Sequence, residues 1–119
     1  MLHAALAHPD DVRALVLIGA TAGIDDDAER SARRAADERL AERIETIGVE
    51  AFVDEWLANP LFAGLSAETA LRADRLRNTA VGLAVSLRST GTGTQEPLWR
   101  RLGRITAPVL VLAGEYDAK

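Results

Sequence analysis

The sequence contains no cysteine, which excludes disulfide bonds, zinc–thiolate sites and cysteine nucleophiles. Aromatic residues make up only 4% of the chain, and alanine is the commonest of the apolar residues that make up 48%. Such a composition buries little area per residue and predicts a modest hydrophobic core. No apolar run reaches the roughly 20 residues of a membrane span, and residues 1–8 lack the features of a signal peptide. We therefore expect no membrane segment, and the cytoplasm as the compartment.

Basic charge is in the minority, with 14 Lys and Arg against 18 Asp and Glu and a net charge of −4. This balance argues against nucleic-acid binding, which needs a basic surface. Apart from Lys119, every member of the Lys and Arg total is arginine. The guanidinium group binds carboxylates in bidentate fashion, but GC-rich coding DNA produces the same bias, so each arginine needs its own argument. The sequence predicts no metal site and no organic cofactor.

Two apolar runs, residues 12–19 and 108–114, predict β-strands near the two ends of the chain. Apart from Arg13 the first run is unbroken, a pattern typical of parallel strands buried on both faces. The second run leads to Asp117, and a strand that ends near a carboxylate is a common way for an α/β enzyme to present an acid. The segment between the runs is far longer than the dozen or so residues that a crossover needs.

That intervening segment has the pattern of several helices. Asp25 to Asp27 can cap the start of a helix, Gly48 is a candidate for its end, and further helices are expected over residues 49–58, from Ser66, and over 79–89. The first helix has an apolar stripe with four-residue spacing: Ala28, Ala32, Ala36, Leu40 and Ile44. We interpret Gly91 and Gly93 as a hinge, not as a phosphate-binding loop.

These elements predict an α/β fold in which two parallel core strands flank a mostly helical cap. The boundaries that we expect are residues 1–22 for a partial core, 23–103 for the helical cap, and 104–119 for a partial core strand ending in the acid. The cap is expected over the carboxyl ends of the strands, where open α/β sheets bind ligands.

Both strand regions resemble the α/β-hydrolase superfamily. Residues 8–19 (HPDDVRALVLIG) are similar to the helix end and sixth strand of that fold, and residues 107–117 (APVLVLAGEYD) to the next core strand and the acid of the catalytic triad. The resemblance implies that the chain is the middle portion of such an enzyme, with Asp117 as the triad acid.

The cap narrows the resemblance to one family. Residues 28–34 (AERSARR), 52–56 (FVDEW), 60–63 (PLFA), 83–88 (LAVSLR) and 114–119 (GEYDAK) are similar to the menaquinone-pathway 2-succinyl-6-hydroxy-2,4-cyclohexadiene-1-carboxylate synthases. This resemblance implies a triad-dependent lyase that expels pyruvate from a small substrate with several carboxylates. Arg33 and Arg75 would bind carboxylates, Trp56 would line the pocket, and Lys119 matches a lysine just after the acid. Arg34, Arg72 and Arg77 are competing candidates.

Two members of a serine triad are missing from the sequence. A nucleophile in this fold needs the Gly-x-Ser-x-Gly turn, and no serine stands in that motif. The histidine base should follow the acid, but His3 and His8 both precede Asp117. We expect the serine in sequence before Met1 and the histidine in sequence after Lys119, so the chain alone should be inactive.

Two alternatives remain open. An esterase or a carbon–carbon-bond hydrolase would use the same fold, because fold does not determine the reaction. The second alternative is a module without catalytic activity, which would form a homodimer through exposed strand edges.

Overall fold

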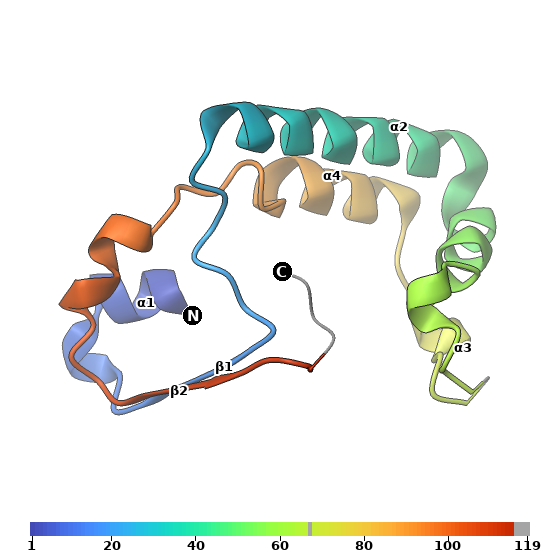
Figure 1. Cartoon of the computed structure of the whole chain (residues 1–119). Helices are drawn as coiled ribbons and strands as arrows, with labels where there is room; N and C mark the ends of the chain where they lie inside the picture. The colour runs from blue at the N-terminus through green and yellow to red at the C-terminus, as the bar shows by residue number, and fades with distance from the viewer. Residues whose placement is uncertain (67, 116–119) are drawn as a thin grey trace.

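The computed structural model describes residues 1–66 and 68–115 and consists of helices and one small parallel sheet (Figure 1). The helices are α1 (Leu2–Ala7), α2 (Asp27–Leu57), α3 (Arg72–Arg75) and α4 (Ala80–Thr90), and the strands are β1 (Leu15–Ile18) and β2 (Val109–Leu112). Short 3-10 helices occupy η1 (Pro9–Asp11), η2 (Pro60–Phe62) and η3 (Trp99–Arg104). Among the described residues, no helix is long and apolar enough to cross a membrane.

The two strands pair in parallel, as the sequence predicts. Leu15 lies opposite Val109 and Ile18 lies opposite Leu112. A backbone hydrogen bond of 2.9 Å from Gly19 N–H to the Leu112 carbonyl extends the ladder. Both strands are shorter than the apolar runs that predicted them.

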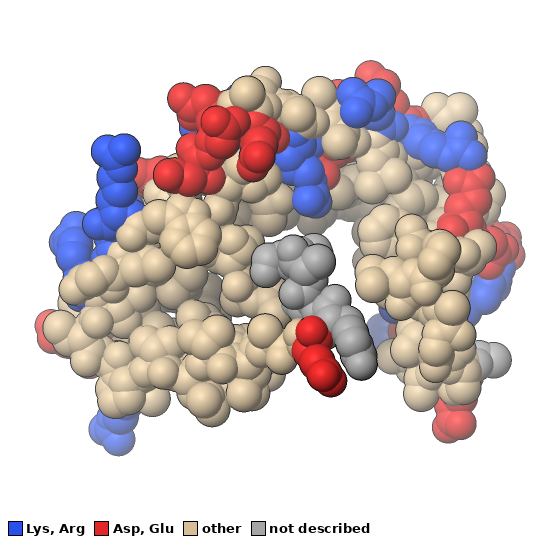
Figure 2. All heavy atoms as spheres, viewed as in Figure 1, with Lys and Arg blue, Asp and Glu red and all other residues tan. Residues whose placement is uncertain are grey.

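The prediction that the first strand is buried on both faces is wrong, and the side chains of β2 are exposed as well. Leu15 is only 3% exposed, but Val16 is 59%, Ile18 73% and Val111 63% exposed. One reason is a gap of about 290 Å³ between α1 and β1, lined by Leu2, Val16 and Ile18 among others. Figure 2 shows a mostly uncharged surface in this part of the molecule.

A small core forms beside the sheet, between α1, η3 and the segment after β1. Its buried members are Leu6, Ala22 and Leu98, and Leu2, Leu102 and Ile105 pack against them. Leu98 N–H donates to the Ala22 carbonyl over 2.8 Å and ties η3 to the end of β1.

Helix α2 begins at an aspartate cap and bends sharply at a glycine. The Asp26 carboxylate accepts a hydrogen bond of 2.8 Å from Glu29 N–H. Gly48 has φ 80° and ψ 167°, which interrupts the helical backbone and confirms the predicted break there. The bend brings Arg43 within 2.9 Å of Glu55, although residues 12 apart would lie about 18 Å apart in a straight helix.

Helix α4 packs antiparallel along α2 (Figure 1). Ala41, Ile44, Val53 and Ala84 are all buried between these helices and their neighbours. The Arg88 guanidinium binds both Glu38 and Glu45, each at 2.8 Å, and so clamps the end of α4 to the first half of α2.

The predicted apolar stripe of α2 is partly wrong. Ala28, Ala32 and Ala36 are exposed, and the buried face runs instead through Asp37, Ala41 and Ile44. The reason is the rotation of α2 toward α4 and the loop after it. This rotation brings the backbone of Arg34 and Arg30 against Gly93, where an added Cβ would lie 2.7 Å from Arg34 N. Gly93 therefore allows close packing of this loop against α2. That role differs from the hinge that the sequence suggested.

The helix predicted from Ser66 is reduced to turns. Ser66 Oγ does accept a hydrogen bond of 3.2 Å from Thr69 N–H, but Leu71 adopts the left-handed region at φ 50° and ends the run. Only α3 follows. The neighbouring prediction over residues 79–89 is confirmed by α4, which Thr79 caps through a 3.0 Å hydrogen bond from Gly82 N–H.

Candidate functional site

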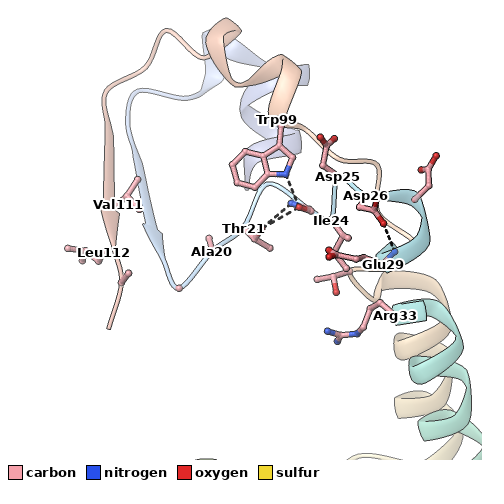
Figure 3. Close-up of a pocket in the computed structure, with 15 residues that line it drawn as sticks. Ala20, Thr21, Ile24, Asp25, Asp26, Glu29, Arg33, Trp99, Val111 and Leu112 are labelled. Atoms are coloured by element: carbon pink, nitrogen blue, oxygen red, sulfur yellow. Dashed lines mark hydrogen bonds between the residues drawn. The ribbon is translucent and has the colours of Figure 1, made fainter. Parts of the chain in front are cut away.

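A large open cavity of about 1150 Å³ lies at the carboxyl ends of the two strands (Figure 3). Ala20 and Thr21 line it just after β1, Leu112 lines it at the end of β2, and Arg33 lines it from α2. The long helical insertion therefore faces the edge of the sheet where parallel strands end, which is the arrangement expected of a ligand site in this class of fold.

Trp99 also lines this cavity, although the sequence did not mark it as a site residue. Its indole N–H donates to the Gly23 carbonyl over 2.9 Å, and the side chain is 49% exposed. Gly23 has φ 100°, and an added Cβ would lie 3.1 Å from Pro97 Cα. The segment after β1 and the start of η3 are thereby joined at the rim.

Arg33 projects from α2 into the cavity (Figure 3). Its Nε–H donates to the Asp37 carboxylate over 2.8 Å, and the side chain is 48% exposed. No hydrogen bond joins its terminal nitrogens to any of the described residues. Its competitor Arg34 instead donates to the Gly93 carbonyl over 3.1 Å. Arg33 is thus the better placed of the two to bind an anion in the cavity.

A second, smaller cavity of about 250 Å³ lies among α2, α3 and α4, and both Trp56 and Arg75 line it. Arg75 Nε–H donates to the Ala70 carbonyl over 2.9 Å, and the guanidinium carbon lies 5.8 Å from the centre of the Phe62 ring. The Trp56 ring lies 5.7 Å from Phe52 and 5.9 Å from Phe62. Trp56 is thus at once part of an aromatic cluster and part of a pocket wall.

Arg72, the other arginine of α3, is paired with two carboxylates. Arg72 binds Asp54 at 2.6 Å and Glu50 at 3.1 Å, and its hydrogen bonds lower the pKa of Asp54. Arg77 lies 3.9 Å from Asp74. Arg75, in contrast, forms no ion pair with the residues that the structure describes.

The predicted site residues therefore divide into two groups and a remainder. Arg33 lies in the large cavity, whereas Trp56 and Arg75 share the small one. Asp117 and Lys119 lie outside the described residues. Asp37 was not singled out by the sequence reasoning, although its four-residue spacing from Arg33 is a recognisable signal for an ion pair.

Comparisons with known proteins agree with the resemblance in the sequence. No family model matches the chain. It is 43% identical over 97% of its length to a Bacillus subtilis protein assigned as a 2-succinyl-6-hydroxy-2,4-cyclohexadiene-1-carboxylate synthase, of which it covers 44%. It is 33% identical over its full length to the synthase of that name from Serratia proteamaculans, of which it covers 48%.

A solved structure of MenH from S. aureus superimposes on the chain with a TM-score of 0.81 and 36% identity, covering 88% of this chain and 41% of the other. The chain thus spans somewhat less than half the length of the relatives that it matches. By sequence and by structure, the chain is a relative of the 2-succinyl-6-hydroxy-2,4-cyclohexadiene-1-carboxylate synthases and carries part of their α/β-hydrolase fold.

Proposed function

We propose that the chain is the cap-bearing part of a menaquinone-pathway lyase that acts on a small polycarboxylate in the cytoplasm. Residues 23–103 are the cap, and residues 1–22 and 104–119 belong to the core. Arg33 and Arg75 bind substrate carboxylates, Trp56 lines the pocket, and Lys119 adds a positive charge close to the acid. Asp117 orients a histidine base that this sequence does not contain.

The observation that carries this proposal is the contrast among the arginines. Arg43, Arg72 and Arg88 each donate hydrogen bonds from terminal nitrogens to carboxylates of the chain itself. Arg33 and Arg75 line cavities, and within the described part of the chain their terminal nitrogens form no hydrogen bonds. An arginine that keeps its terminal fork open in a cavity can bind an incoming carboxylate in bidentate fashion.

Binding and turnover are separate tests of this function. For binding, titration calorimetry with succinate would compare the 119-residue chain with Arg33→Gln and Arg75→Gln. Each variant is expected to weaken binding by about tenfold, the equivalent of one charge-assisted contact. Arg39→Gln is the matched control, because Arg39 is an exposed arginine of α2 that lines neither cavity. Equal affinities in all four proteins would refute carboxylate binding at these positions.

For turnover, pyruvate release would be measured with the isolated chain and with a chimera. In the chimera, this chain replaces the matching segment of the Bacillus subtilis relative. The isolated chain is expected to be inactive because it lacks a nucleophile and a base, and the chimera active. The rival esterase or carbon–carbon-bond hydrolase would instead cleave uncharged substrates and be insensitive to Arg33→Gln.

Self-association is the second candidate, favoured by the exposed strands. Ile18 and Val111 are more than half exposed, and Figure 2 shows few charges in the part of the molecule where the strands lie. Unpaired strand edges are templates for pairing. Light scattering over a concentration series is expected to detect a homodimer that Ile18→Lys dissociates. Val81→Lys on α4, where Val81 is 65% exposed, is the control. A monomer at every concentration would exclude this candidate.

A further inference from the structure

Asp37 is a buried carboxylate on α2, at the end of α4. The residue is 5% exposed. Its Oδ1 accepts the hydrogen bond from Arg33 Nε–H, whereas its Oδ2 is buried without a hydrogen-bond partner among the described residues. Burying a carboxylate costs free energy unless the charge is paired, so Arg33 is what stabilises Asp37 in this position.

Burial distinguishes this ion pair from the others in the described residues. The Asp37 side chain is 7% exposed, whereas the next most buried acidic partner, Glu45, is 39% exposed. Exposed pairs contribute little free energy and hold their side chains loosely. The buried Asp37 cannot follow a mobile partner, so it restrains the orientation of Arg33.

Gly91, at the end of α4, makes room for the buried carboxylate. A Cβ added at Gly91 would lie 2.5 Å from Asp37 Oδ2 and 2.6 Å from the Leu87 carbonyl oxygen. The φ of Gly91 is −57°, an ordinary value for any residue. The glycine is therefore required by space and not by backbone conformation, and α4 forms one wall of the Asp37 site.

The geometry of the pair determines which part of Arg33 remains open. A guanidinium group is planar and presents its N–H donors in a fixed fork. When Nε–H is bound to Asp37, the edge formed by the two terminal nitrogens is left to face the large cavity. That edge can form bidentate contacts with a carboxylate, as the terminal nitrogens of Arg88 do with Glu45.

We propose that Asp37 is a positioning residue, which holds Arg33 through Nε–H so that the terminal fork of Arg33 points at a substrate carboxylate. The proposal rests on the function proposed above for Arg33. It adds that α4, through Gly91, participates in setting the orientation of an anion-binding side chain on α2.

The test combines succinate titration with nitrogen-15 NMR of the arginine side chains in the 119-residue chain. Asp37→Asn is expected to weaken succinate binding by about tenfold, as Arg33→Gln does. Because both act through one contact, the double variant should bind no more weakly than Arg33→Gln alone. The Arg33 Nε–H signal should be protected from exchange with water in the parent chain and lose that protection in Asp37→Asn.

The outcomes separate this proposal from the function on which it rests. Arg33→Gln without effect on succinate, together with a protected Nε–H signal, would refute the binding role and leave the positioning contact standing. Loss of binding in Arg33→Gln but not in Asp37→Asn, or losses that simply add in the double variant, would refute positioning.

A second pair of variants guards against unfolding of Asp37→Asn. Gly91→Ala keeps every charge but displaces the Asp37 carboxylate, and it is expected to reproduce the loss of succinate affinity and of Nε–H protection. Gly103→Ala, where an added Cβ meets nothing within 4 Å, is the matched control. Unchanged binding and protection in a folded Gly91→Ala variant would overturn the proposal.

Discussion

Replacing Gly48 with alanine tests whether the bend in α2 depends on backbone conformation alone. Gly48 has φ 80° and ψ 167°, a region that is essentially restricted to glycine and costs other residues about 1–3 kcal/mol. An added Cβ would meet nothing within 4 Å, so no steric clash adds to this cost. We therefore expect Gly48→Ala to lower the free energy of unfolding by about 1–3 kcal/mol.

The assay is urea unfolding followed by circular dichroism. With a denaturant dependence of about 1–3 kcal/mol per molar urea, the midpoint should fall by roughly 1 M. Gly103→Ala is the control, because its Cβ also meets nothing within 4 Å and its φ is not in the left-handed region. It should be neutral or stabilising by up to about 1 kcal/mol, since alanine restricts the unfolded chain.

The bend also has a structural signature that can be measured independently. It brings Glu55 to Arg43, and the hydrogen bonds from Arg43 lower the pKa of Glu55. A variant that relaxes the bend should return this pKa toward its ordinary value, as followed by carbon-13 NMR of the carboxyl group. Equal urea midpoints for Gly48→Ala and Gly103→Ala, with the Glu55 pKa unchanged, would refute the reasoning.

Three further perturbations test the packing of α4 against α2. Ile44→Ala should destabilise the chain by about 2–5 kcal/mol and Ile44→Val by about 0.5–1.5 kcal/mol, because Ile44 is 1% exposed; equal losses in urea unfolding would contradict this. Arg88 lowers the pKa values of Glu38 and Glu45 through hydrogen bonds. The contribution of these ion pairs to the free energy of unfolding should therefore be present above pH 4.5 and lost as the pH falls below it. The difference in urea midpoint between the parent and Arg88→Gln should therefore shrink in acid, and a constant difference would refute the pairing. Thr79→Ala should lower the free energy of unfolding by about 1 kcal/mol and Thr79→Ser by much less, because serine can still cap α4. Equal melting temperatures for these two variants would contradict this.

The sequence predicted those elements whose signals are local. Asp26 caps α2 and Thr79 caps α4 because their side chains bond to backbone N–H groups within three residues. Gly48 marks the break because few other residues tolerate its backbone conformation. The apolar runs around Leu15 and Val109 predicted strands, and the unbroken apolar pattern of the first run predicted the parallel pairing.

Burial was harder to predict because it depends on what each side chain meets. Ala32 and Ala36 suggested a buried stripe, but α2 turns Asp37 and Ala41 toward α4 instead. Ser66 has the pattern of a helix cap, but the run that it begins ends at Leu71.

For the candidate site, the sequence by itself determined the residue types and their order, from which the site residues are predicted. It supplied Arg33, Arg75 and Trp56 between the two strands and Asp117 after the second, and it lacks a nucleophile and a base in the order that a triad needs. These conclusions depend on residue type and order along the chain, which folding does not change.

Only the tertiary structure decided which of these side chains meet. It separated Arg33 from Arg75 into two cavities and engaged Arg72 with Asp54. It also buried Asp37 beneath Arg33 against Gly91, a residue far along the sequence. The physical reason is that charge pairing and burial depend on distances in space, which the packing of α4 on α2 sets and which no local pattern encodes.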